Sequence, residues 1–294
     1  MLKFEQILPG IYMMKVPFST IWSGVLLVEG TEKVLVDSCV SDSSVDDYIV
    51  PGLRDLGLEL SDITWLINTH AHGDHMGGND RILTSCPSIK LAAFEVTADK
   101  VENPLPYSVA TRAKWPEHSP KPPKSIPGHK PDLVLKEGDV LAGRLQIIHT
   151  PGHDTECISL LDTQTNSILT GDSIQAFGMT GVDGAGMAFY KDLPAYRKSM
   201  DKIQMLNVEN IIFSHDFRPF GYAARGREEV RTMLKVCKVA PEIYTMLVRK
   251  KMNEGITELD QLSLAVLDEL GVEPPPMLFQ PMYTLNEHVK ELKG

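Results

Sequence analysis

The sequence has few cysteines, no long hydrophobic run and no secretory leader pattern. Its four cysteines are Cys39, Cys86, Cys157 and Cys237. They lie far apart and form no CxxC pair, so their spacing does not indicate a protein held together by disulfides. No apolar run approaches the roughly 20 residues that a membrane-spanning helix needs. The first ten residues, MLKFEQILPG, lack the basic and apolar regions of a signal peptide. We therefore expect a soluble, cytoplasmic protein with unpaired thiols and no membrane partner.

Clustered positive charge is also missing. The chain carries 29 Lys and Arg against 39 Asp and Glu, a formal net charge of -10, and the basic residues form no run. Nucleic acids and anionic membranes attract proteins through clustered positive charge. We therefore expect a small-molecule substrate and no nucleic-acid partner.

The remaining composition is that of an ordinary globular protein. The 294 residues are 43% hydrophobic and 23% charged. This length permits one large domain with a smaller appendage.

A dense group of potential metal ligands lies in residues 69–78, which read THAHGDHMGG. It contains His70, His72, Asp74 and His75, and it follows a short apolar run, residues 63–67, that reads as a buried strand. Imidazole and carboxylate ligands suit zinc, iron or manganese, whereas calcium prefers oxygen alone. The pattern predicts a metal site at the end of this strand.

The same arrangement occurs five times along the chain. A short apolar strand is followed each time by an acidic residue or a histidine, namely Asp37, the cluster at His70, His153, Asp172 and His215. Strands that end on the same side of a sheet system would bring these side chains to a common rim. We expect them to converge there.

Two long connections have open interpretations. Residues 103–131 contain eight prolines and little periodicity, and they form either a wall or lid of a substrate cleft or a surface excursion, which could be an oligomer contact. Residues 174–191 are rich in glycine and methionine and are predicted to be a mobile cover. A homo-oligomer is thus one of the alternatives.

The pattern becomes helical from Gly226, and we divide the chain into a catalytic domain, residues 1–225, and a helical extension, residues 226–294. Thr257 is expected to begin one helix in a capping box, and Thr284 to cap a short final helix. His288, on that last helix, is expected at the surface. The apolar stripes of the extension are interpreted as core, without chemistry.

The ordered motifs resemble those of the metallo-β-lactamase-fold hydrolases. They are THAHGDH at residues 69–75, TPGH at 150–153, TGD at 170–172 and SH at 214–215, preceded by VLVDS at 34–38. The resemblance covers residues 1–225 and implies an α/β, four-layer αββα sandwich with metals at one edge between the sheets. The tail resembles the helical, winged-helix-like extension of some members.

The resemblance also implies a ligand set. His70, His72 and His153 match the ligands of a first metal, and Asp74, His75 and His215 match those of a second. Asp172 matches the carboxylate that bridges the two ions, and Asp37 an acidic residue that supports them. The implied cofactors are two divalent ions, zinc first and iron or manganese as alternatives.

Three departures from well-known members concern the substrate. Glu156 stands where glycine is usual in the TPGHTxG motif, and Gln175 stands where acyl-homoserine lactonases carry a tyrosine. Residues 173–181 lack the glycine- and cysteine-containing stretch of hydroxyacylglutathione hydrolases. Zinc β-lactamases usually carry a cysteine at the position of Asp172. The motifs therefore support none of these three substrate identities.

The function that these residues favour is metal-dependent hydrolysis of a small ester, thioester or lactone by a metal-bridged hydroxide. A two-metal site lowers the pKa of bound water towards about 7, and Asp74 would act as ligand and proton carrier. Tyr190 and Tyr222 are candidates for protonating the leaving group. The alternatives are a mononuclear iron enzyme resembling persulfide dioxygenases, a phosphodiesterase of the same fold, and a binding protein with structural metals.

Overall fold

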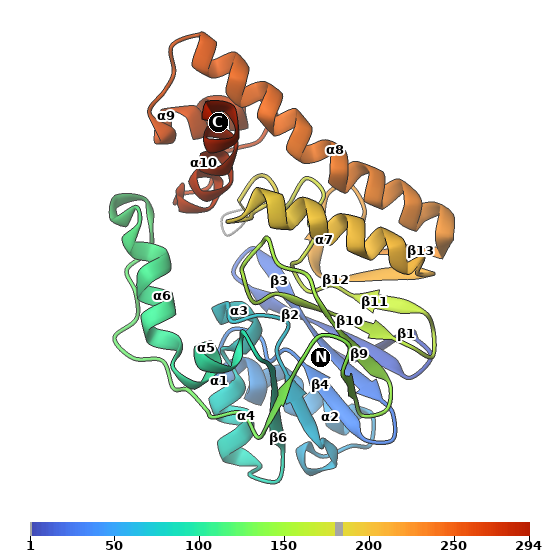
Figure 1. Ribbon diagram of the computed structural model, residues 1–294. Helices are drawn as coiled ribbons and strands as arrows, with labels where there is room; N and C mark the ends of the chain where they lie inside the picture. The colour runs from blue at the N-terminus through green and yellow to red at the C-terminus, as the bar shows by residue number, and fades with distance from the viewer. Residues whose placement is uncertain (1, 180–184) are drawn as a thin grey trace.

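The computed structural model describes residues 2–179 and 185–294 and shows two β-sheets packed face to face with helices on both outer faces (Figure 1). The first sheet runs in chain order: β1 (Glu5–Leu8), β2 (Ile11–Phe18), β3 (Ile21–Glu29), β4 (Lys33–Val36), β5 (Trp65–Ile67), β6 (Lys90–Phe94) and β7 (Leu133–Leu135). The second has the order β13 (Gly221–Arg225), β12 (Asn210–Phe217), β11 (Ser167–Leu169), β10 (Ile158–Asp162), β9 (Leu145–His149) and β8 (Val140–Leu141). This confirms the predicted αββα sandwich.

Most helices of the first 225 residues cover the two outer faces. The full set is α1 (Asp42–Ser44), α2 (Val50–Asp55), α3 (Gly73–Met76), α4 (Asn79–Ser85), α5 (Ala98–Glu102), α6 (Pro104–Ala113) and α7 (Leu193–Leu206), with a π-helical turn at Val45–Ile49 and 3₁₀ turns at Leu60–Asp62 and Pro116–His118. In Figure 1, α2 and α4 lie on the first sheet and α7 on the second, whereas α6 stands apart at one end.

Strand β3 shows why the sandwich needs both layers. Val25 and Leu27 pack under the helices of the first sheet, whereas Leu26 and Val28 point into the core between the sheets. Successive side chains of a strand alternate between faces, so a continuous apolar run is stable only where both faces are covered.

Parallel strand pairs position the candidate ligands. Strands β4, β5 and β6 are parallel neighbours in the first sheet, and β11 is parallel to β12 in the second. The chain segments that follow β4, β5 and β11 therefore emerge at one edge of the sandwich, which is where the repeated pattern of strand and ligand predicted a common rim.

Prolines are more compatible with helices here than the sequence indicated. Helix α2 continues directly from the π-helical turn, with Pro51 in its first turn. Residues 103–131, predicted to be irregular, contain α6, with Pro104 and Pro106 in its first turn. The first four N–H groups of a helix have no intrahelical acceptor, so proline loses little there.

The C-terminal extension is helical, as predicted, and comprises α8 (Gly226–Asn253), α9 (Leu259–Glu269) and α10 (Phe279–Lys293). The boundary of the predicted domains at residue 226 remains a prediction, because α8 to α10 share one hydrophobic cluster with α7 and β12. Among the described residues, no helix is long and apolar enough to cross a membrane.

Three expectations for this extension were wrong. Glu258, not Thr257, is the N-cap of α9, and it makes no side-chain cap. Thr284 lies inside α10, where its buried hydroxyl donates to the Ala188 carbonyl at 2.9 Å. His288 is buried, within hydrogen-bond distance of the Tyr190 hydroxyl at 2.6 Å. The errors for Thr284 and His288 have one cause: both side chains contact residues 188–190, and a local capping pattern does not reveal such long-range contacts.

The predicted mobile cover falls partly on residues 180–184, which lie outside the described residues. The described flanks are packed segments: Ile174, Ala176, Met187, Ala188 and Tyr190 belong to the hydrophobic cluster that α7 and α8 cover. These flanks are therefore core rather than an exposed loop.

Candidate metal centre

All seven predicted ligands meet at one edge of the sandwich, between the two sheets. His70, His72, Asp74 and His75 come from the connection after β5 and from α3, His153 from the β9–β10 loop, Asp172 from the segment after β11, and His215 from β12. They form three groups whose potential ligand atoms lie within 4.8 Å of one another: His70, His72 and His153; His70, His75 and Asp172; and Asp74, His75 and His215.

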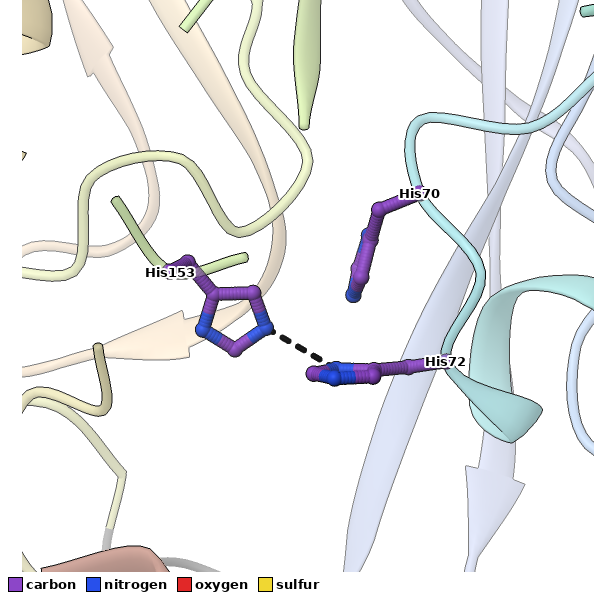
Figure 2. Close-up of side chains that lie close together, drawn as sticks. All are labelled: His70, His72 and His153. Atoms are coloured by element: carbon purple, nitrogen blue, oxygen red, sulfur yellow. Dashed lines mark hydrogen bonds between the residues drawn. The ribbon is translucent and has the colours of Figure 1, made fainter. Parts of the chain in front are cut away.

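The first group is a triad of imidazoles that point toward one another (Figure 2). His153 Nε2 lies 2.9 Å from His72 Nδ1. His70 Nε2 is buried and has no hydrogen-bond partner among the described residues. A buried nitrogen without a partner is costly unless a cation occupies the space it faces.

The second group combines carboxylates with imidazoles. His215 Nε2 lies 3.3 Å from Asp74 Oδ2 and 3.5 Å from Asp172 Oδ1, and His75 Nε2 lies 3.7 Å from Asp172 Oδ1. Asp172 Oδ1 is buried without a hydrogen-bond partner among the described residues. Its other oxygen, Oδ2, lies 3.7 Å from His153 Nε2. Asp172 thus lies between the two groups, as a bridging ligand would.

Outer hydrogen bonds fix the ring orientations. The Nδ1 atoms of His153 and His215 donate to the carbonyls of Phe189 at 2.7 Å and Trp22 at 2.6 Å. Because a carbonyl only accepts, each Nδ1 carries a proton, and Nε2 of each ring is the atom that a metal ion could bind. His75 Nδ1 lies 2.8 Å from Asp37 Oδ2, which gives Asp37 the supporting position that the resemblance implied.

The charges of the two groups differ. Burial is the main cause that lowers the pKa of His72 and of His153 to about 4, so both are neutral imidazoles at pH 7. Burial also acts to lower the pKa of His75, but Asp74, Asp37 and Asp172 outweigh it and raise this pKa to about 10. The second group therefore attracts positive charge, and the first offers neutral nitrogens.

Together the donors fit transition-metal binding. Five imidazoles and two carboxylates, with two orphaned buried atoms among them, match the ligand preferences of zinc, iron or manganese. They could hold two ions that share Asp172.

A buried charge network, missed from the sequence, supports His72. Asp154 Oδ2 lies 3.5 Å from His72 Nε2 and 2.5 Å from Lys191 Nζ, and it accepts a hydrogen bond from the Tyr107 hydroxyl. Lys100 Nζ lies 3.2 Å from Asp154 Oδ1. The only sequence signal was the pair of acidic residues at 154 and 156, next to the third histidine motif.

Glu156 continues this network. It is fully buried, one oxygen accepts from the Ala71 backbone N–H at 3.3 Å, and the other pairs with Lys100. Burial and, next, Asp154 raise the pKa of Glu156 to about 7. The residue that replaces the usual glycine therefore ties the THAHGDH loop to α5.

A cleft of about 880 Å³ opens over the centre. Its floor includes His72, Asp74, His153 and Asp172, and one wall comes from residues 104–127, which confirms the cleft-wall interpretation of the proline-rich segment. Pro275, Pro276, Met277, Phe279 and Gln280 of the C-terminal extension also line it. The extension, expected to be core only, thus contributes to the cleft.

Other candidate residues lie elsewhere. Tyr190 is fully buried, and its hydroxyl meets His288 rather than the cleft, so it does not serve as a proton donor. Tyr222 packs under Lys15, whose Nζ lies 3.7 Å from the ring centroid, and it is not among the cleft-lining residues. His149, just before the TPGH motif, is not one of the seven predicted ligands, and its Nε2 lies 2.9 Å from the Thr155 carbonyl oxygen.

Comparisons with known proteins agree with this geometry. The chain is 31% identical over 162 residues to the uncharacterized protein YobT of Bacillus subtilis, a match that covers 54% of this chain and 64% of that protein. It is 32% identical over 155 residues to the "Probable metallo-hydrolase MJ0888" of Methanocaldococcus jannaschii, covering 52% of this chain and 68% of that one. The chain therefore spans less than two thirds of the Bacillus subtilis relative.

The fold is shared with solved structures. A metallo-beta-lactamase family protein from Thermus thermophilus superposes with a TM-score of 0.72 at 20% identity, over 98% of this chain and 95% of that one. The sequence model of the protein family "Metallo-beta-lactamase superfamily" matches residues 22–215. This stretch begins in β3 and ends at the last candidate ligand. The chain belongs to the metallo-beta-lactamase superfamily.

Proposed function

We propose that this protein is a hydrolase that uses two divalent ions, zinc first, to cleave a small ester, thioester or lactone. The observation that carries the proposal is the position of Asp172 between two ligand groups, with Oδ1 toward His75 and His215 and Oδ2 toward His153. Family membership and the similarity to a protein named as a metallo-hydrolase support it.

Two ions, when bound, would acidify water and polarise the carbonyl oxygen of the substrate. The chain's own residues hold the reacting groups in place. His70, His72 and His153 form one binding surface for an ion, and Asp74, His75 and His215 form the other. The Asp74 side chain is 22% exposed and lines the cleft, so it is the ligand best placed to carry a proton between water and the leaving group.

The cleft supports a small-molecule partner. Apolar side chains dominate the walls beyond the polar floor, among them Met187, Phe189 and Phe279. Such a site suits an acyl compound. Arg112 is the one lysine or arginine among the described residues that line it, which leaves these residues without a basic track for a nucleic-acid backbone. A cytoplasmic location remains part of the proposal.

The test combines metal analysis with a hydrolysis panel. Purified protein should bind close to two ions per chain and hydrolyse at least one ester, thioester or lactone. His72→Ala should lose an ion and the activity, whereas His118→Ala, outside the centre, should change neither. Two bound ions with no hydrolysis across the panel, including phosphodiesters, would end the proposal. A single iron with sulfur-dependent oxygen uptake would favour the dioxygenase alternative.

A further inference from the structure

Helix α6 presents one continuous face to the cleft. Its cleft-lining residues are Pro104, Tyr107, Ser108, Thr111 and Arg112, a spacing that places them on one side of a helix. Tyr107 marks the end nearest the metal centre, because its ring stacks on His72 with centroids 6.1 Å apart and planes 18° apart. With a rise of about 1.5 Å per residue, Arg112 lies about 7 to 8 Å farther along the wall.

Arg112 lacks a counterion among the described residues. Its Nη1 donates to the Ser108 carbonyl at 3.0 Å and to the Ser108 hydroxyl at 2.5 Å, both neutral acceptors. Its Nε is buried without any hydrogen-bond partner. By contrast, Arg54, Arg81 and Arg197 each pair with a carboxylate.

The surroundings make this unpaired charge costly. Burial lowers the pKa of Arg112, and a guanidinium removed from water is stable when a planar anion satisfies its fork of donors. Arg218 is also without a carboxylate, but its Nη2 donates to the Phe177 and Gly186 carbonyls, and it does not line the cleft. Among the described residues, Arg112 is the one arginine that both lacks a carboxylate partner and lines the cleft.

Apolar surface lies in the same cleft. Ile126, Met187, Phe189, Met277 and Phe279 all contribute to its lining. The cleft therefore offers three kinds of surface: a polar floor with the candidate ligands, apolar walls, and one cation on α6.

We propose that the natural substrate is an acyl compound with an apolar chain and a carboxylate, and that Arg112 binds this carboxylate while the scissile group lies at the metal centre. This proposal rests on the proposed hydrolase function for the reaction at the scissile group, whereas the binding of the carboxylate by Arg112 does not depend on it. Arg112 is a specificity residue, because its guanidinium meets a part of the substrate that does not react.

Two chromogenic esters of equal chain length test this directly. Mono-para-nitrophenyl suberate ends in a carboxylate, and para-nitrophenyl octanoate ends in a methyl group. Arg112→Gln should raise KM for the suberate ester by roughly tenfold to a hundredfold, the range of a lost charge-assisted pair, with little change in kcat. KM for the octanoate ester should change less than about twofold, since no charge is lost to it.

Two further variants separate charge from geometry and from general damage. Arg112→Lys keeps the charge but not the fork, so its KM for the suberate ester should lie between those of wild type and Arg112→Gln. Arg54→Gln, an exposed arginine paired with Glu59 outside the cleft, should leave both esters unaffected. Equal changes for both esters in Arg112→Gln, or no change for either, would overturn the proposal.

A binding measurement keeps this test independent of hydrolysis. If neither ester is cleaved, the hydrolase proposal is contradicted, but two uncleaved amides still serve as probes of the zinc-loaded protein: the monoamide of suberate, which ends in a carboxylate, and octanamide, which ends in a methyl group. The suberate monoamide should raise Tm more than octanamide does in wild type, and this difference should disappear in Arg112→Gln. If the two amides act equally on wild type, Arg112 does not select carboxylates.

Discussion

Asp154 joins a candidate ligand to the wall of the cleft. Its carboxylate faces His72 on one side and Lys100, Lys191 and Tyr107 on the other. A carboxylate behind a ligating imidazole fixes the ring and raises its basicity. Burial acts to raise the pKa of Asp154, but the hydrogen bond with His72 and the charge of Lys191 hold this pKa well below its usual range.

Replacing Asp154 with Asn should weaken metal binding at the His70, His72 and His153 group by roughly tenfold to a hundredfold, the usual loss for such outer partners. Zinc affinity, measured by competition with a chromogenic chelator, checks this on protein that remains folded by circular dichroism. Tyr107→Phe removes one donor but keeps the carboxylate, so its effect on affinity should be smaller.

Asp201→Asn is a suitable control, because Asp201 pairs with Lys238 on the surface. It should leave zinc affinity unchanged. Equal affinities for wild type and Asp154→Asn would show that Asp154 serves only the stability of the fold.

At the residue level, the sequence predicted the candidate metal ligands better than it predicted the residues that hydrogen-bond to them or line the cleft. Six of the seven ligands lie in segments that follow strands and His215 lies within β12, so local pattern and motif located them. Asp154 and Arg112 depend on α6 and α5 reaching the same edge of the sheets, a long-range arrangement that no local spacing encodes. His288 was misplaced for the same reason, since its burial comes from contact with Tyr190.

At the level of elements, the loop that carries His153 packs directly on α7. Gly152 has φ of +140°, and a Cβ there would lie 2.4 Å from Tyr196 Cα. Its carbonyl accepts from the Lys191 N–H at 2.8 Å and the Asp192 N–H at 3.1 Å, which fixes the loop to the start of the helix.

Gly152→Ala should therefore lower stability and displace His153. Gly138→Ala is the matched control, because Gly138 also has a positive φ of +88° but a Cβ added there would have nothing within 4 Å. Both variants incur backbone strain, and the steric clash should cost Gly152→Ala about 2 kcal/mol more in free energy of unfolding. Urea denaturation and zinc content measure the two effects. Similar losses in both variants would refute the close packing on α7.

A second prediction at this level concerns how α10 docks. Burial lowers the pKa of His288 to about 4. Tyr190 and Thr245 meet its two ring nitrogens, Glu291 lies 4.0 Å from Nδ1, and Arg197 adds a repulsive charge. In the unfolded chain the histidine binds a proton near pH 6.5, well above the pKa of about 4 in the folded chain. The neutral, buried His288 therefore stabilises the fold fully above about pH 6.5, and this stabilisation is lost as the pH falls toward 4.

Wild type should therefore lose about 2 kcal/mol of unfolding free energy through His288 between pH 7 and pH 5. His288→Gln, which cannot titrate, should be less stable at pH 7 and show a correspondingly weaker loss on acidification. Chemical denaturation at both pH values measures the difference. Parallel pH profiles for the two proteins would contradict it.

The prediction of helices and strands succeeded where the local hydrophobic pattern determines the element. It failed where prolines or tertiary contacts determine where an element begins. The strand predicted at residues 63–67 is present as β5, Trp65–Ile67. Strand β10, however, was missed, and α6 was taken for irregular chain because its prolines cluster in the first turn. Helix α10 begins at Phe279, ahead of the predicted cap, because Thr284 bonds to Ala188 rather than to its own helix end.

At the level of the whole molecule, the centre lies across the interface between the two sheets. One sheet supplies His70 to His75, and the other supplies His153, Asp172 and His215. Bound ions would therefore link the two halves of the sandwich, and they would also offset the repulsion among Asp37, Asp74 and Asp172.

Removing metal should thus destabilise the whole chain. At a zinc concentration about a thousandfold above Kd, binding adds roughly 4 kcal/mol, so a chelator should lower Tm by about 10 °C. Calorimetry before and after EDTA, followed by restoration with zinc, measures this. An Asp172→Asn variant should respond less. An unchanged Tm in wild type after verified metal loss would show that the ions do not bridge the sheets.

The cleft walls have a different origin from its floor. The floor belongs to the sandwich, whereas much of the walls comes from residues 104–127 and from residues 275–280 near the carboxyl end. In the proposed hydrolase, reactivity and much of the selectivity would therefore reside in separate parts of the chain. A designer could exchange the start of α10, or the residues of α6 other than Tyr107, for other sequences and retarget the catalyst while its bond-breaking machinery stays untouched.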